Sequence, residues 1–90
     1  MTVYVDPARH PFGHMMMCHM MADSTAELLA MADRIGVQRK WLQRPGTPYE
    51  HFDISKAMRT KALKLGAQEV TSRDLGLLIR ERRRAAAQTS

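Results

Sequence analysis

The chain has 90 residues, of which 44% are hydrophobic and 26% charged, and its formal net charge is +5. This length predicts a single small domain, and the hydrophobic fraction excludes an intrinsically disordered chain. The one cysteine, Cys18, excludes an internal disulfide framework and any zinc motif built on cysteine pairs, and it is typical of a reducing cytoplasm.

Charge is distributed unevenly along the chain. Residues 1–33 carry one base and four acids, whereas residues 34–90 carry 13 bases and five acids. A basic half predicts a polyanionic partner, such as nucleic acid or an acidic protein, or alternatively a well-solvated surface. No stretch reaches the ~18–20 apolar residues of a membrane span, and no apolar segment follows a basic start. We therefore expect a cytoplasmic protein with no membrane partner and no signal peptide.

The first predicted elements are two strands. Residues 3–5 are short and β-rich, which predicts the first strand. Residues 9–13 contain Pro11 and Gly13 and predict a loop. The Met-rich run 15–21 predicts a second strand that is apolar on both faces.

A helix is predicted to begin after Ser24. The sequence Ser24-Thr25-Ala26-Glu27 is a capping box, apolar residues follow it at helical spacing, and Gly36 can adopt the left-handed conformation that ends a helix. Residues 37–43 then predict a third strand, and residues 45–48 predict a loop.

A second helix is predicted between Ile54 and Leu65, where apolar residues again recur at helical spacing. Asp53 and Ser55 are rival N-caps for this helix. Residues 69–71 follow and predict a short fourth strand.

The third helix is predicted to begin at Ser72 as its N-cap, and residues 85–90 are predicted to fray, which gives one domain over residues 1–84. The predicted order is β-β-α-β-α-β-α, a small α/β fold with a mixed sheet. Helical connections predict that strands two to four are parallel, and the short linker after strand one predicts that strand one is antiparallel. The residues predicted to be buried are apolar or thiol side chains on the inward faces of these elements: Met16, Cys18, Leu28, Met31, Ile35, Met58, Leu65, Leu75 and Ile79.

Several short segments carry a family signature because they occur in one order. They are Met1 to Asp6, Arg9-His10-Pro11, Cys18-His19-Met20, Ala22-Asp23, Glu27-Leu28, Met31 to Gly36, Trp41, His51-Phe52-Asp53 and Gly66-Ala67. Together they resemble the small domain-of-unknown-function 4031 family of bacteria and their phages, over roughly residues 1–75. The resemblance implies no particular activity. The chain departs from the family pattern at residues 44–50, where its loop looks longer.

Polar, ligand-capable side chains stand at the ends of several predicted elements and could converge on one cleft. Ligands bind at the carboxyl ends of parallel strands. That edge is predicted to hold Asp23, the loop 44–53 with His51 and Asp53, Ser72 and Arg73. The full set of candidate cleft residues also includes three that join only if their loop reaches this edge: Asp6, Arg9 and His10.

His51 and Asp53 are the candidate metal ligands, and Asp6, His10 and His19 offer further carboxylate and imidazole groups. Such ligands suit Zn, Mn or Fe, and without thiolates a structural zinc site is not expected. The alternative is that Asp53 caps a helix, His51 lies in a loop and His19 is a core histidine bonded to backbone.

Two functions therefore remain open. The first is a binding or accessory domain that docks on nucleic acid or an acidic partner, for which the candidate contacts are Arg80, Arg82, Arg83 and Arg84. The alternative for these arginines is that they complement a helix dipole. The second function is a metal-assisted enzyme that uses His51 and Asp53 on a phosphate-bearing substrate. Cys18 is not a predicted nucleophile with His19, because adjacent strand residues point to opposite faces.

Overall fold

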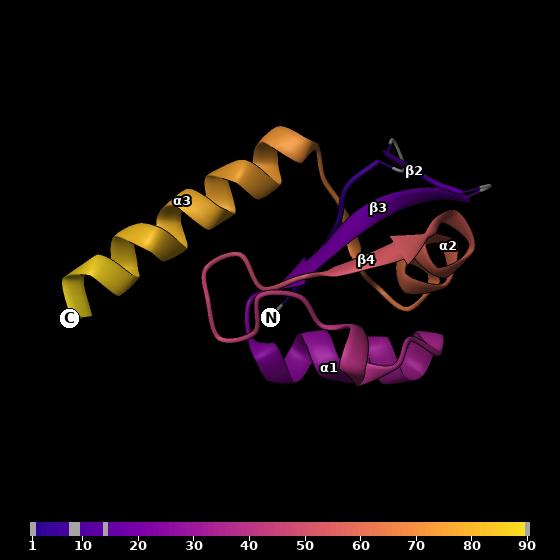
Figure 1. Ribbon diagram of the computed structural model, residues 1–90, viewed down its shortest axis with the longest axis horizontal. Helices are drawn as coiled ribbons and strands as arrows, with labels where there is room; N and C mark the ends of the chain where they lie inside the picture. The colour runs from indigo at the N-terminus through magenta and orange to yellow at the C-terminus, as the bar shows by residue number, and fades with distance from the viewer. Residues whose placement is uncertain (1, 8–9, 14, 90) are drawn as a thin grey trace.

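The computed structural model describes residues 2–7, 10–13 and 15–89, and these form a mixed sheet of five strands with helices on both faces (Figure 1). The order of elements is β1 (Val3–Val5), β2 (His10–Phe12), β3 (Met15–Ala22), α1 (Thr25–Ile35), a 3-10 turn η1 (Arg39–Trp41), β4 (Phe52–Ser55), α2 (Lys56–Lys64), β5 (Gln68–Glu69) and α3 (Ser72–Thr89). The α/β class is as predicted. The predicted domain boundary at residue 84 lies inside α3.

Strand β3 is the centre of the sheet. It pairs antiparallel with β1 and β2 along one edge and antiparallel with β4 along the other. The antiparallel pairing of the first strand is confirmed. β5 pairs parallel with β1.

The prediction of three parallel strands linked by helices is wrong. Residues 37–43 contain the 3-10 turn η1 in place of a strand, and Trp41 there is 62% exposed. That position in the sheet is occupied by β4, although the sequence predicts that its residues begin a helix. β4 can run antiparallel to β3 because the long connection through α1 and η1 leaves the chain free to return in either direction.

Strand β2 lies where Pro11 and Gly13 in the sequence predict a loop. Pro11 pairs with Met16 at the edge of the sheet, where its missing N–H is tolerated. Gly13 has a φ of 62° and forms the turn to β3. β2 and β3 therefore form a hairpin, and Met16 on it is exposed, not buried as predicted.

Helix α1 follows the sequence prediction. The Ser24 hydroxyl accepts a hydrogen bond from the Glu27 amide at 3.2 Å and donates one to the Glu27 carboxylate at 3.0 Å. Gly36 ends the helix with a φ of 88°. The inward residues Leu28, Met31, Ala32 and Ile35 are all buried.

Asp53 and Ser72, two residues that the sequence predicts as helix N-caps, do not cap helices in the structure. Ser55, not Asp53, caps α2 by accepting from the Met58 amide at 3.3 Å. The predicted cap of α3 is wrong, because the Thr71 hydroxyl accepts from the Asp74 amide at 3.0 Å while the Ser72 hydroxyl is bonded elsewhere. Asp53 and Ser72 are therefore available for a site on the sheet.

The hydrophobic core lies between one face of the sheet and helices α1 and α2. Alternation places Cys18 and Met20 of β3 and Phe52 and Ile54 of β4 on this face, and all four are nearly inaccessible to solvent. Of the remaining predictions, Leu75 is buried, Met58 and Ile79 are partly buried, and Leu65 is exposed. The opposite face of the sheet carries the intervening residues of both strands and lies under the first half of α3 (Figure 1).

Candidate metal centre

Three ligand-capable side chains meet on the face of the sheet under α3. His19 and Asp53 are direct partners across β3 and β4. His51 precedes Asp53 by two residues, so both side chains point to the same face. His51 is held in place by an isolated antiparallel bridge to Gln43, with backbone hydrogen bonds of 2.9 and 3.1 Å.

The ligand atoms of these residues are close enough to share one ion. Asp53 Oδ1 lies 3.4 Å from His51 Nε2 and 3.9 Å from His19 Nε2. One ligand atom from each residue lies within 4.8 Å of the other two. Ligands of a tetrahedral Zn²⁺ ion at ~2.0–2.1 Å are separated by roughly 3.3 Å, so a small adjustment of side chains would close the site.

Each histidine ring is oriented by a contact at Nδ1, the ring nitrogen that faces away from Asp53. His51 Nδ1 donates to the carbonyl oxygen of Tyr49 at 2.6 Å, and a carbonyl can only accept, so this bond places the proton on Nδ1. His19 Nδ1 lies 2.8 Å from Asp6 Oδ2. Both Nε2 atoms then face Asp53. A carboxylate or carbonyl on the far nitrogen is the usual outer-sphere arrangement of metal-binding histidines.

Asp53 has one engaged and one unengaged oxygen. Gln43 Nε2 donates to Oδ2 at 2.6 Å, whereas Oδ1 is buried and accepts no hydrogen bond from any residue that the structure describes. A buried oxygen without a donor costs about 1–3 kcal/mol. A cation between Oδ1 and the two imidazoles would remove this cost, so the donor set fits a metal ion.

Asp6 supports the site from behind His19. It is 2% exposed, and its Oδ1 accepts from the His19 amide at 2.7 Å. Ser72 donates from its hydroxyl to Asp6 Oδ2 at 3.2 Å, and Arg59 Nε donates to the Asp6 carbonyl at 2.8 Å. These bonds fix the carboxylate that holds the His19 ring.

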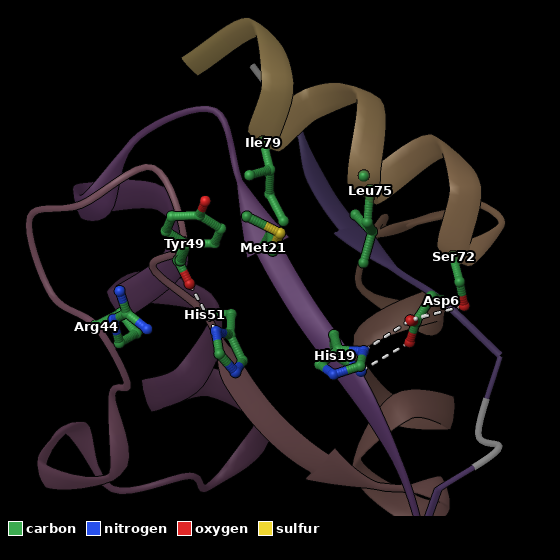
Figure 2. Close-up of a pocket in the computed structure, with 10 residues that line it drawn as sticks. Asp6, His19, Met21, Arg44, Tyr49, His51, Ser72, Leu75 and Ile79 are labelled. Atoms are coloured by element: carbon green, nitrogen blue, oxygen red, sulfur yellow. Dashed lines mark hydrogen bonds and ion pairs between the residues drawn. The ribbon is translucent and has the colours of Figure 1, made fainter. Parts of the chain in front are cut away.

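A pocket of about 300 Å³ opens beside the three ligand-capable side chains, between the sheet and α3. His19 and His51 both line it (Figure 2). Arg44 and Tyr49 lie on the His51 side, Asp6 and Ser72 lie on the His19 side, and Met21, Leu75 and Ile79 form an apolar wall (Figure 2). A small molecule in this pocket would therefore be able to reach an ion held by the three side chains.

The other predicted cleft residues lie elsewhere or outside the described residues. Asp23 accepts from the Tyr4 hydroxyl at 2.7 Å and from the Thr2 amide at 2.9 Å, and its hydrogen bond raises the pKa of Tyr4. Arg73 is exposed on the first turn of α3. Arg9 lies outside the described residues, as does the side chain of His10, of which only the backbone position in β2 is described.

The predicted anion-binding arginines are not equivalent. Arg82 is partly buried and donates from its guanidinium to the carbonyl oxygen of Ala22, so it ties α3 to the end of β3. Arg84 is exposed and lies 3.7 Å from the Glu81 carboxylate. Arg80 and Arg83 are exposed on α3.

Cys18 lies on the core face of β3, opposite His19. Burial, and to a smaller extent the nearby carboxylate of Asp6, raises the pKa of its thiol to about 12. The thiol is protonated at neutral pH and is no nucleophile.

Sequence reasoning named His51 and Asp53 but assigned His19 more readily to the core, and it gave no role to Gln43, Arg44 or Tyr49. A signal was present in the segment His51-Phe52-Asp53-Ile54-Ser55. Its alternation of polar and apolar residues is that of a half-buried strand, which would have placed both ligands on one face.

Fold and site together define a small α/β protein with a candidate metal centre of two histidines and one aspartate. The chain belongs to the family described as "Protein of unknown function (DUF4031)", which it matches over residues 3–82. Neither the curated proteins nor the solved structures compared with it contain a significant match. Within the described residues, no helix combines the length and the apolar character needed to cross a bilayer.

Proposed function

We propose that this protein is a metal-dependent enzyme that holds one divalent ion with His19, His51 and Asp53. The observation that carries the proposal is the buried Oδ1 of Asp53, which accepts no hydrogen bond from the described residues and faces two imidazoles whose Nδ1 atoms are engaged. Two nitrogen ligands and one oxygen ligand suit Zn, Mn or Fe.

The ligand set favours a catalytic ion over a structural one. Structural zinc sites are closed by four protein ligands, whereas catalytic sites have three protein ligands and an open position. Here three side chains converge and two of them line a pocket. A divalent ion held by His19, His51 and Asp53 would lower the pKa of a bound water and polarise a phosphoryl or carbonyl oxygen of the substrate. This chemistry fits hydrolysis of a phosphate-bearing or related substrate.

The chain's own residues have distinct parts in this proposal. Asp6 and the Tyr49 carbonyl keep both histidines in the tautomer that presents Nε2. Gln43 engages one oxygen of Asp53 and so limits Asp53 to a single ligand atom. The apolar wall above the site, which includes Leu75 and Ile79, reduces access of bulk water and strengthens the electrostatic effect of the ion.

The test is metal binding by purified, chelator-treated protein. Titration with Zn²⁺ in a calorimeter should give one ion per chain. Thermal unfolding with and without Zn²⁺ should show a higher Tm for the zinc-loaded protein. His51→Gln and Asp53→Asn should each weaken binding by about tenfold to a hundredfold or more. Asp33→Asn is the matched control, because Asp33 is exposed and paired with Arg39 on another surface. Binding that is absent, or that survives both substitutions unchanged, would overturn the proposal.

A second candidate function is binding of nucleic acid by α3. The C-terminal half of this helix extends beyond the sheet, and Arg80, Arg83 and Arg84 on it are exposed (Figure 1). Binding should be sequence-tolerant and should weaken steeply with salt, because phosphates and not bases are contacted.

The test of this second candidate is fluorescence anisotropy with single- and double-stranded oligonucleotides at low salt, about 50 mM. Replacing Arg80, Arg83 and Arg84 together by Ala should flatten the salt dependence. Replacing Lys56, Lys61 and Lys64 of α2, which are also exposed, makes the same charge change at another surface. No binding at low salt, or equal losses in both triple variants, would contradict a nucleic-acid site on α3.

A further inference from the structure

The pocket beside the metal ligands has the features of a site for a small amphipathic anion. We propose that it binds a small molecule that carries an oxyanion on an apolar body, with Arg44 as the anion-binding residue. This inference rests on the proposed function, because the ion at His19, His51 and Asp53 supplies the second polar contact to the same molecule.

Arg44 is a cation held at the rim of the pocket. Its guanidinium carbon lies 5.1 Å from the centre of the Tyr49 ring, a distance at which cation–π attraction restrains the side chain. No carboxylate pairs with it in the part of the chain that the structure describes. A guanidinium stacked on a ring still has its N–H donors available in the plane of the fork, where a carboxylate or phosphate can accept two of them.

The backbone at Arg44 is fixed in an uncommon conformation. Its φ of 53° lies in the left-handed region, which non-glycine residues seldom adopt. The Thr47 hydroxyl donates to the Arg44 carbonyl at 2.8 Å and the Thr47 amide donates at 3.2 Å, so the turn is closed on itself. Such strain persists where the surrounding structure enforces it, and it is common in ligand-binding loops. Here it places Arg44 and Tyr49 on the same side of the pocket (Figure 2).

The apolar wall of the pocket favours a ligand whose body is apolar. Leu75 and Ile79 point from α3 toward the sheet, where Met21 lies between the two histidines and the helix (Figure 2). These three side chains offer no hydrogen-bonding group other than a weak sulfur acceptor. A sugar or a peptide backbone would leave polar groups unpaired against them.

Size limits the ligand to a small molecule. A volume of about 300 Å³ is at the lower end of the range of small-molecule pockets, which fits a ligand of small size. Charge favours an anion, because a divalent ion would balance the two carboxylates of Asp53 and Asp6, and Arg44 adds a positive charge on the same side of the pocket. The ligand class is therefore an aryl or alkyl carboxylate, or an aryl or alkyl phosphate ester.

The test uses the zinc-loaded protein with methyl-labelled methionine. Phenylacetate and phenyl phosphate are the probes, and the Met21 methyl signal should shift while the signals of the exposed Met15 and Met16 should not. Acetate, inorganic phosphate and benzyl alcohol each lack either the apolar body or the anion, and they should bind about tenfold or more weakly than the matching probe. A preference for one of the two probes identifies the oxyanion as carboxylate or phosphate.

Arg44→Gln is the decisive variant and Arg83→Gln, on exposed α3 surface, is its control. Arg44→Gln should weaken binding of the preferred probe by about tenfold and leave the Zn²⁺ titration unchanged. If zinc binds but neither probe shifts Met21, or if Arg44→Gln binds the probe as tightly as its control, the inference is overturned while the metal centre stands. If zinc does not bind, the proposed function fails first, and this inference fails with it.

Discussion

His19 and Asp53 are direct partners in the antiparallel register of β3 and β4, and His19 Nε2 lies 3.9 Å from Asp53 Oδ1. This pairing brings together residues that are 34 positions apart in the sequence. His51 reaches the same face because it lies two residues before Asp53. The candidate metal centre is therefore a property of strand register, and a shift of β4 by one residue would turn His51 and Asp53 into the core.

Asp53→Asn should separate the binding role of this residue from its structural role. In the chelator-treated protein we expect the free energy of unfolding to stay the same or to rise by up to about 1 kcal/mol. The reason is that Asp53 Oδ1 accepts no hydrogen bond from the described residues, whereas the amide of the variant can donate to His51 Nε2. With Zn²⁺ at about 100 times the wild-type Kd, the wild type should gain about 2.7 kcal/mol, and the variant should gain about 1.4 kcal/mol or less. Urea unfolding with and without Zn²⁺ measures both. A large loss of stability in the metal-free variant would make Asp53 structural.

Leu28→Ala should destabilise the protein by roughly 2–4 kcal/mol, since it leaves a cavity under α1. Leu28 is 1% exposed and belongs to the core formed with β3 and β4. Leu29 is only partly buried at the edge of this core and is the control, with an expected loss of about 1 kcal/mol. The free energy of unfolding in urea measures the difference. Equal losses in both variants would show that this helix face is not the inward one.

Arg82→Ala should destabilise the protein by about 1–2 kcal/mol, because its guanidinium donates to the Ala22 carbonyl and ties α3 to β3. Arg83→Ala should change stability by less than about 0.5 kcal/mol, since Arg83 is exposed. Thermal unfolding of both variants gives the comparison. The same loss in both, or none in either, would contradict a structural contact at Arg82.

The free energy of unfolding should fall at alkaline pH because burial raises the pKa of the Cys18 thiol. The folded protein raises the pKa of this thiol to about 12 from an ordinary value of 9.0, so the unfolded chain releases the proton first as pH rises. The contribution of the thiol is fully present below pH 9.0 and is lost as pH rises toward about 12. Cys18→Ala should remove this part of the alkaline decline, which urea titrations at pH 8 and pH 10.5 can follow. An unchanged decline in the variant would show that Cys18 does not contribute.

Thr71→Ala should weaken α3 by about 1 kcal/mol, because the Thr71 hydroxyl caps the helix. Ser72→Ala should leave the helix capped, and its effect should appear in Zn²⁺ affinity, since the Ser72 hydroxyl bonds the carboxylate that orients His19. Helix content by circular dichroism and Zn²⁺ titration separate the two. Loss of helix in the Ser72 variant would restore the sequence-based assignment of the cap.

The sequence predicted features that depend on neighbouring residues. The capping box at Ser24, the helical spacing of Leu28 and Met31, and the glycine at position 36 act within a few residues of one another, and α1 has these bounds. The pairing of the first strand with the Met-rich strand was also predictable, because a short linker permits few alternatives. The sequence also predicts His51 and Asp53 as candidate ligands by residue type, but it predicts a helix start where they lie next to or within β4.

The sequence by itself determined the local helices, the α/β class, the inert buried thiol of Cys18 and membership of the family. Only the tertiary structure decided that His19 faces Asp53 and that Asp6 stands behind His19. The physical reason is that the pairing of strands depends on the simultaneous burial of apolar side chains from several strands and helices. Phe52 and Ile54 enter the core beside Cys18 and Met20, and this packing turns His19, His51 and Asp53 to the opposite face, where no local spacing in the sequence indicates that they meet.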